Sequence, residues 1–123
     1  MWSTMKRIRP ALWLDLHSWH LGVAEGAYGP DARLVGQEKF DALMKPLAEA
    51  VGRHFPISQW GADTLDCPNT QALMQLGIPG FCPEFNMGKG ADGRWKTVED
   101  QKNLGVELLR GVNDYLLSLG VRS

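Results

Sequence analysis

Hydrophobic and polar residues alternate along residues 11–17. Leucines occupy positions 12, 14 and 16, while Trp13, Asp15 and His17 occupy the positions between and after them. Successive side chains of an extended strand point to opposite faces, so Asp15 and His17 should share one face and the leucines the other. The pattern predicts a buried strand that carries two polar groups toward its end.

Three further segments are typical of strands. Residues 80–86 form a mostly apolar run, and shorter candidates lie near residues 23–25 and over residues 56–60. Pro83 lies inside the apolar run, and proline cannot donate a backbone hydrogen bond to a neighbouring strand. We therefore expect residues 80–86 to lie at an edge of the sheet or to contain a bulge.

Helical patterns fill most of the remaining chain. Apolar residues recur at spacings of three and four over residues 37–53, although Pro46 should bend or split this helix. A shorter helix is predicted for residues 68–76, because a proline opens it and Gly77 can end it. Thr97 is the expected N-cap of a long C-terminal helix. The apolar positions of that helix are Leu104, Leu108, Val112, Leu116 and Leu119.

The alternation of strands and helices indicates an α/β fold, with a layered sheet and flanking helices. Of the 123 residues, 44% are hydrophobic and 22% are charged, which is the composition of a folded globular protein. We expect a single domain over residues 1–123. Four short strands would form a small sheet with incompletely protected edges, so we also expect the chain to form a homo-oligomer.

Charge and cysteine content narrow the partners and the compartment. A formal net charge of -1 gives no electrostatic reason to expect nucleic acid or an anionic membrane as a partner. The apolar stretch near the N-terminus is broken by Asp15 and His17, so it is too short for a signal peptide or a membrane span. Cys67 and Cys82 form no Cys-x-x-Cys pair and are interpreted as reduced thiols, which favours the cytoplasm.

Two places combine reactive side chains with strand ends. His17 and His20 lie where the first strand passes into a loop, and an imidazole there can face a cleft with one nitrogen. Glu84 lies among apolar residues of the second strand, where burial would raise the pKa of its carboxyl group and suit it to general-base catalysis. The pattern also permits a structural histidine and an ordinary surface glutamate at these positions.

Together these segments resemble the zinc metallocarboxypeptidases of the carboxypeptidase A-like family. The Leu-Asp-Leu-His-Ser-Trp of residues 14–19 is similar to the family strand that ends in Asp-x-His-Ser/Gly-aromatic. The Gly-Ile-Pro-Gly-Phe-Cys-Pro-Glu-Phe-Asn of residues 77–86 is similar to the strand that bears the catalytic glutamate. The resemblance extends over residues 10–119 and covers the C-terminal part of the family's catalytic domain.

The resemblance implies a zinc-dependent hydrolase that acts on small peptide, amide or ester substrates. His17 matches a zinc ligand, with His20 as a further candidate. Glu84 matches the glutamate that activates a zinc-held water and then passes the proton to the leaving group. Ser18 and Trp19 match positions that line the substrate cleft. The implied fold is a partial zinc-carboxypeptidase fold.

The family's other two zinc ligands lie in a His-x-x-Glu motif, and this chain departs from that pattern. None of its histidines is followed by glutamate three residues later. The resemblance therefore implies that the chain begins within the catalytic domain. A catalytic zinc site usually has three protein ligands, so other residues would have to complete it. The candidates are His20, His54, Cys67, Cys82 and Asp15.

Two other interpretations remain open. The chain could be an inert α/β remnant that oligomerises, or a metal-independent esterase in which Cys82 or Cys67 is the nucleophile. A serine hydrolase is disfavoured, because the sequence has no Gly-x-Ser-x-Gly motif and Ser18 follows a histidine.

Overall fold

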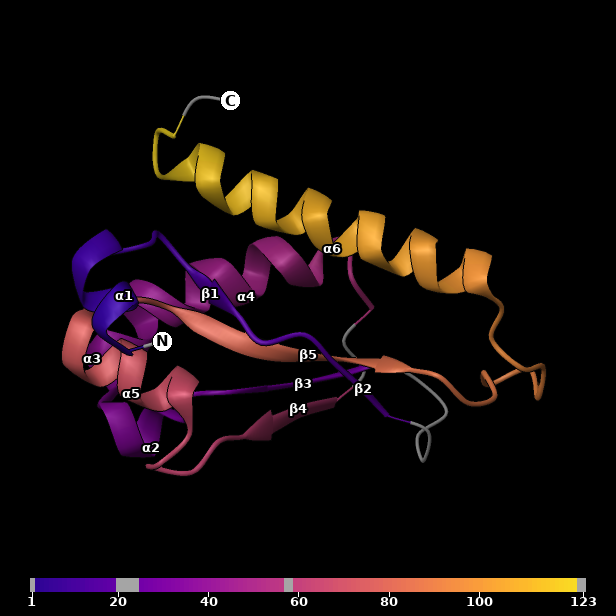
Figure 1. Ribbon diagram of the computed structural model, residues 1–123, viewed down its shortest axis with the longest axis horizontal. Helices are drawn as coiled ribbons and strands as arrows, with labels where there is room; N and C mark the ends of the chain where they lie inside the picture. The colour runs from indigo at the N-terminus through magenta and orange to yellow at the C-terminus, as the bar shows by residue number, and fades with distance from the viewer. Residues whose placement is uncertain (1, 20–24, 57–58, 122–123) are drawn as a thin grey trace.

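The fold is described here from a computed structural model, which covers residues 2–19, 25–56 and 59–121. Helices lie on both sides of a central sheet (Figure 1). The elements in chain order are α1 Trp2–Ile8, β1 Trp13–Leu14, β2 His17–Trp19, β3 Gly26–Gly29, α2 Ala32–Val35, α3 Gln37–Lys39, the π-helical turn η1 Phe40–Met44, α4 Lys45–Gly52, β4 Gln59–Ala62, α5 Pro68–Leu76, β5 Gly80–Asn86 and α6 Val98–Ser118.

Strand β5 lies at the centre of the sheet. On one side it pairs in parallel with β1 and then with β2, and on the other side it pairs antiparallel with β3. Strand β4 pairs in parallel with β3 and forms the far edge. The register places His17 directly opposite Glu84. The two strands predicted to carry chemistry are therefore neighbours, and the predicted α/β fold with a layered sheet is confirmed.

The alternation of side chains along β5 separates the two faces of the sheet. Phe81 and Phe85 face the larger core, which contains residues of α4 and α6, and Phe85 makes an edge-to-face contact with Phe55 at a ring separation of 5.3 Å. Cys82 and Glu84 have the opposite parity and lie on the face covered by α1 and α5. The polar residues of β5 thus point away from the main hydrophobic core.

The prediction of an edge position or a bulge for residues 80–86 is wrong, because β5 is the central strand and its described pairs with β1, β2 and β3 continue without a shift in register. The expected continuous strand over residues 11–17 is also divided, with Asp15 and Leu16 between β1 and β2. Asp15 N donates to Phe81 O at 3.2 Å, so the backbone N–H and C=O of Phe81 point toward the chain segment that contains β1 and β2. The backbone groups of a strand alternate in direction, so those of Pro83, two residues later, point toward the same segment. The missing N–H of Pro83 therefore coincides with the gap between β1 and β2.

The helix predicted over residues 37–53 is confirmed as a succession of helical segments, and Pro46 does alter it. The π-helical turn η1 comes before the proline, and the N–H of Lys45 donates to the carbonyl of Phe40. Pro46 is then the second residue of α4 and has no N–H to donate to the preceding helical turn. The proline thus changes the hydrogen-bonding pattern where two helical segments join.

The other predicted elements differ mainly in their boundaries. The strand expected near residues 23–25 begins at Gly26, and the one expected over residues 56–60 is β4, although residues 23–24 and 57–58 lie outside the described part of the chain. Helix α5 ends as predicted at Gly77, which has a left-handed φ of 67°. Thr97 caps α6 as predicted, in a reciprocal capping box with Asp100. None of the described helices is long and apolar enough to cross a membrane.

Candidate active site

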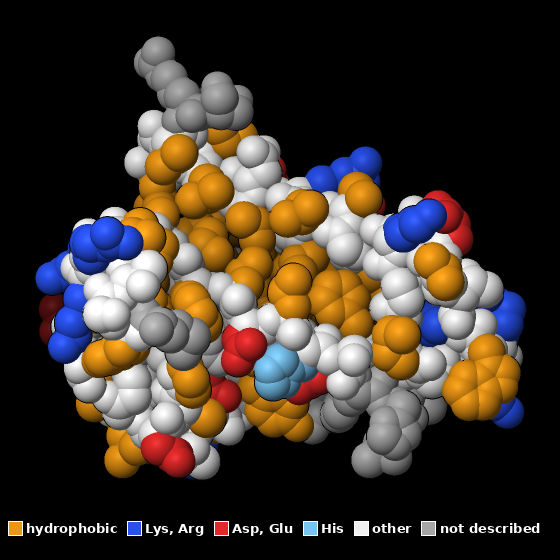
Figure 2. All heavy atoms as spheres, viewed as in Figure 1, with side chains coloured by type: hydrophobic (Ala, Val, Ile, Leu, Met, Phe, Trp, Pro, Cys, Tyr) orange, Lys and Arg blue, Asp and Glu red, His pale blue; other side chains and the backbone are white. Residues whose placement is uncertain are grey.

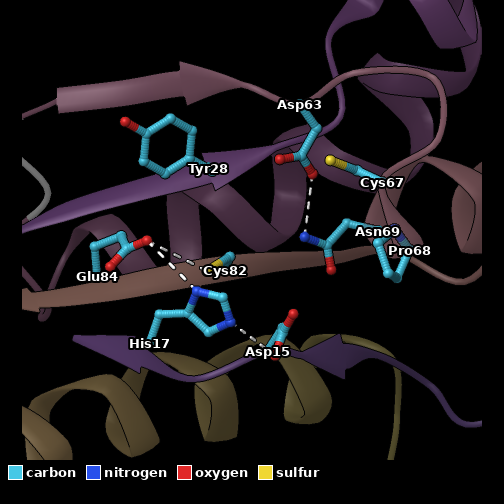
Figure 3. A pocket seen from close by; sticks show the side chains of 9 residues that line it. All are labelled: Asp15, His17, Tyr28, Asp63, Cys67, Pro68, Asn69, Cys82 and Glu84. Atoms are coloured by element: carbon cyan, nitrogen blue, oxygen red, sulfur yellow. Dashed lines mark hydrogen bonds and ion pairs between the residues drawn. The ribbon is translucent and has the colours of Figure 1, made fainter. Parts of the chain in front are cut away.

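A cavity of about 300 Å³ opens on the face of the sheet that carries Cys82 and Glu84 (Figure 3). Its walls come from β5, from the segment joining β1 to β2 and the start of β2, from β3, and from the stretch between β4 and the start of α5. The residues that line it are Asp15, His17, Tyr28, Asp63, Cys67, Pro68, Asn69, Cys82 and Glu84.

The imidazole of His17 stands between two carboxylates. Its Nε2 lies 3.3 Å from Asp15 Oδ1, and its Nδ1 lies 3.7 Å from Glu84 Oε1. The side chain of His17 is 53% exposed, whereas that of Glu84 is 13% exposed. His17 is therefore at the mouth of the cavity and Glu84 lies deeper. The alternation of residues 11–17 predicted that Asp15 and His17 would share a face, and this is confirmed.

The thiol of Cys82 is buried beside the same glutamate. Cys82 Sγ lies 3.8 Å from Glu84 Oε1, and the residue is 6% exposed. Burial, followed by the negative charges of Glu84, Asp15 and Asp63, raises the pKa of the Cys82 thiol to about 12. Cysteine nucleophiles have lowered pKa values, so this environment is the opposite of an activating one.

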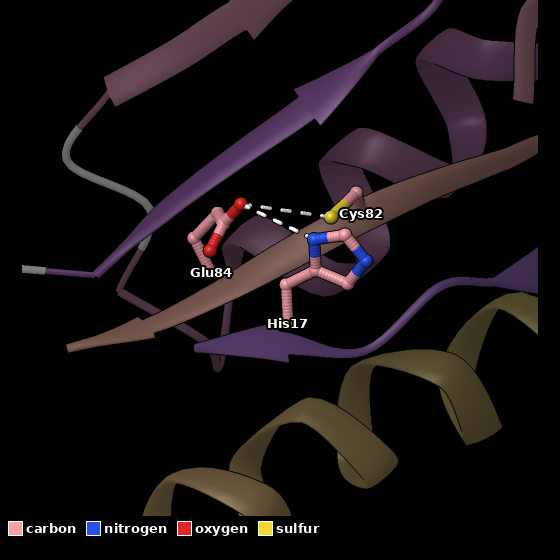
Figure 4. A group of neighbouring side chains, drawn as sticks. All are labelled: His17, Cys82 and Glu84. Carbon is pink, nitrogen blue, oxygen red and sulfur yellow. Dashed lines mark hydrogen bonds and ion pairs between the residues drawn. The ribbon is translucent and has the colours of Figure 1, made fainter. Parts of the chain in front are cut away.

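The donor atoms of His17, Cys82 and Glu84 all lie within 4.8 Å of one another (Figure 4). Imidazole nitrogen, thiolate sulfur and carboxylate oxygen are the three ligand types that bind zinc in proteins. Asp15 lies beside the remaining nitrogen of His17, and metal-bound histidines commonly donate that second N–H to a carboxylate. The donor set therefore fits a divalent ion of the zinc type.

Asp63 and Asn69 form the part of the wall that lies before and at the start of α5. Asn69 Nδ2 donates to Asp63 Oδ2 at 3.1 Å, and burial raises the pKa of the Asp63 carboxyl. Asn69 is 3% exposed, and its Oδ1 has no hydrogen-bond partner among the described residues. None of the described residues that line the cavity is lysine or arginine. The cavity therefore offers hydrogen-bond acceptors and negative charge.

Other residues named from the sequence lie elsewhere or only partly contribute. Ser18 is exposed on β2 and does not line the cavity, Trp19 ends β2, and His20 lies outside the described residues. His54 lies between α4 and α6, where its Nε2 is 2.8 Å from Asp114 Oδ2, and it is not part of this cavity.

Cys67 lines the cavity but is not in the cluster of possible metal ligands. The sequence reasoning missed Tyr28, Asp63 and Asn69. Asp63 follows directly after a strand, and polar residues after strand ends are a signal that could have found it.

Comparison with known proteins shows the fold but no family. No family model and no curated protein matches the chain. A metallo-carboxypeptidase from Burkholderia cenocepacia matches 95% of this chain with a TM-score of 0.74 and 13% identity. A predicted carboxypeptidase from Burkholderia mallei matches 94% with a TM-score of 0.70 and 11% identity. The chain spans only 33% of the length of each of these two structures.

An N-acetylmuramoyl-L-alanine amidase of Nostoc punctiforme is a more distant neighbour. It matches 94% of this chain and 63% of its own length, with a TM-score of 0.51 and 13% identity. The chain thus has a carboxypeptidase-like fold, and its structural neighbours include two kinds of hydrolase.

Proposed function

We propose that the chain is the C-terminal part of a metal-dependent hydrolase of the carboxypeptidase type. The observation that carries this proposal is the direct pairing of His17 with Glu84 on adjacent strands, with Nδ1 and Oε1 3.7 Å apart. The fold shared with a metallo-carboxypeptidase supports the same conclusion. The bond to be cleaved is a peptide, amide or ester bond.

Three polar residues of the cavity have separate tasks in this proposal. His17 would hold the metal through Nδ1, and Asp15 would orient the imidazole ring by accepting a hydrogen bond from Nε2. Glu84 accepts a proton from the attacking water and delivers it to the leaving amine or alkoxide. A zinc ion bound here would polarise the substrate carbonyl and make water a better nucleophile near neutral pH. Because Glu84 is mostly buried, it is shielded from bulk solvent while it holds the proton.

The charge of the cavity restricts the substrate. A peptide with a free C-terminal carboxylate is usually bound by a cation, most effectively by the planar fork of an arginine. The described lining offers the carboxylates of Asp15, Asp63 and Glu84 and no such cation. We therefore propose that this part of the site favours substrates that carry no charged carboxylate next to the scissile bond. A matched pair of peptides, one with a free and one with an amidated C-terminus, tests this preference, and faster cleavage of the free acid would contradict it.

The Glu84→Gln variant tests the mechanism, because it keeps the shape of the side chain and removes the base. General-base catalysis contributes roughly 10²–10⁴ in rate, so hydrolysis of an activated ester in the presence of zinc should fall by that factor. Glu49→Gln is the matched control, since Glu49 is exposed on α4 and lies outside the cavity. Unchanged turnover in Glu84→Gln would refute the proposed role.

The cysteine-esterase interpretation loses support at Cys82, where the raised pKa keeps the group as a thiol at neutral pH. Hydrolysis that persists after chelation of all metal, and that is abolished in Cys82→Ser, would restore that interpretation.

A further inference from the structure

Cys82 lies inside the candidate active site but has no task in the hydrolytic mechanism proposed above. We propose that Cys82 Sγ is a metal ligand together with His17 Nδ1, so that the site binds its ion through sulfur and nitrogen, with the carboxylate of Glu84 beside it. This assignment rests on the proposed function, which locates the metal ion at His17, and adds Cys82 as a second protein ligand.

The spacing of the donor atoms supports this assignment. In a tetrahedral zinc site, bond lengths of about 2.0–2.3 Å separate neighbouring ligand atoms by roughly 3.3–3.8 Å. Glu84 Oε1 lies 3.7 Å from His17 Nδ1 and 3.8 Å from Cys82 Sγ, and all three atoms lie within 4.8 Å of one another. Small side-chain rotations would therefore suffice to bring the nitrogen and the sulfur to bonding distance of one ion.

The electrostatic environment favours a cation at this point. Besides the thiol, the described lining includes the carboxylates of Asp15, Asp63 and Glu84 and no lysine or arginine. A divalent ion would balance this negative charge. As the sulfur–metal bond forms, the thiol proton of Cys82 passes to solvent, so the bound state pairs the cation with a thiolate.

The position of Cys82 on the central strand makes it a better ligand than Cys67. Cys82 has the same strand parity as Glu84 and is paired with Tyr28 of β3. Cys67 lies outside regular structure just before α5, where its sulfur contacts Thr64 Oγ1 at 3.5 Å. Sites held by rigid elements keep their ligands in place more accurately than sites on loops.

A thiolate ligand gives the site a definite metal preference. Sulfur and imidazole ligands select zinc and similar transition ions, whereas magnesium and calcium prefer sites made of oxygen atoms. The site is therefore expected to bind Zn²⁺, Co²⁺ and Cd²⁺ and to discriminate against Mg²⁺ and Ca²⁺.

Titration of the metal-free chain with Co²⁺ tests the proposal, because cobalt bound to a thiolate gives a near-ultraviolet charge-transfer band. The band should develop in the unaltered protein and in Cys67→Ser, in which Cys82 is the only remaining cysteine of the two in the chain. It should be absent from Cys82→Ser, and His17→Ala should bind cobalt at least about tenfold more weakly. A band that persists in Cys82→Ser and vanishes in Cys67→Ser would overturn the assignment.

X-ray absorption spectra of zinc-loaded Cys67→Ser provide a test that does not depend on a variant of a proposed ligand. The expected spectrum has sulfur in the first coordination shell, and a shell of nitrogen and oxygen alone would refute the proposal. Failure of the proposed function gives a different result. A cobalt–thiolate band without hydrolysis would leave Cys82 as a ligand and remove the catalytic role of Glu84. Metal-dependent hydrolysis without the band would keep the catalytic role of Glu84 and exclude Cys82 as a ligand.

Discussion

Helices α4 and α6 approach each other closely at Gly111. A methyl group added to this residue would lie 2.5 Å from Val51 Cα, 3.1 Å from Ala50 O and 3.2 Å from Val51 O. These are backbone atoms of α4, so the contact can be relieved only if the two helices move apart. Gly105 lies on the same helix, and no described atom lies within 4 Å of the Cβ that alanine would add there. The two glycines therefore form a matched pair.

The structure predicts opposite effects for the two Gly→Ala changes. Replacing glycine by alanine in a helix stabilises it by roughly 0.5–1 kcal/mol, and Gly105→Ala should raise the free energy of unfolding by that amount. Gly111→Ala gains the same helical preference but overpacks the interface, which typically costs about 1–3 kcal/mol. It should therefore lower the free energy of unfolding by up to about 2.5 kcal/mol. The difference between the two variants isolates the steric cost.

Urea unfolding followed by circular dichroism measures this difference directly, provided that the dependence on urea is the same for both variants. In thermal unfolding, each kcal/mol should shift Tm by about 4 °C for a domain of this size. If Gly111→Ala is as stable as Gly105→Ala, or more stable, then the backbones of α4 and α6 do not lie in close contact at Gly111.

Three further predictions concern the N-terminus of α6, the candidate site and the assembly. Asp100→Asn should lower the urea midpoint at neutral pH, because Arg94 and Thr97 hydrogen-bond the carboxylate and lower the pKa of Asp100. This stabilisation is complete above the ordinary carboxyl pKa and is lost as the pH falls through the lowered pKa of Asp100. The difference in urea midpoint between wild type and variant should therefore disappear in acid. A difference that stays constant with pH would contradict the prediction. Asp15→Ala should weaken zinc binding by about tenfold in calorimetric titration, because the imidazole of His17 loses its orienting partner, and unchanged affinity would exclude that role. The homo-oligomer expected from the sequence remains a prediction, and a monodisperse monomer in light scattering would count against it.

Two features of the surface are relevant to the predicted homo-oligomer. Hydrophobic side chains gather on the viewed face below α6 (Figure 2). A separate apolar cavity of about 210 Å³ lies where α1 meets β1 and is lined by Thr4, Met5, Ile8, Pro10, Leu12, Trp13 and Leu14. Exposed apolar surface of this kind commonly marks a contact with another protein segment.

The sequence predicted those features that depend on neighbouring positions. Strand alternation placed Asp15 and His17 on one face, and they are 3.3 Å apart. The capping residue Thr97 and the stop at Gly77 were also predicted correctly, because a helix end is determined by the residues next to it.

Features that depend on distant parts of the chain were harder to predict. The rule that confines Pro83 to an edge failed, because the neighbouring strand is interrupted where the proline lacks its donor. Nothing in the local sequence distinguished His54 from a metal ligand, but the packing of α4 against α6 places it beside Asp114. The family resemblance implied that His17 and Glu84 belong to one catalytic site, but the sequence did not predict their pairing, since the register between strands distant in sequence is not encoded locally.

That register has a consequence for how the site could change over evolutionary time. His17 and Glu84 are joined through adjacent strands, whose spacing of about 4.8 Å is imposed by the backbone ladder. Asp63, Cys67 and Asn69, by contrast, come from the connection after β4 and the first turn of α5. Substitutions in that connection can remodel one wall of the cavity while the histidine and the glutamate keep their separation. Substrate preference could therefore diverge among descendants of this chain, or in a library randomised over residues 63–67, without rebuilding the reactive pair.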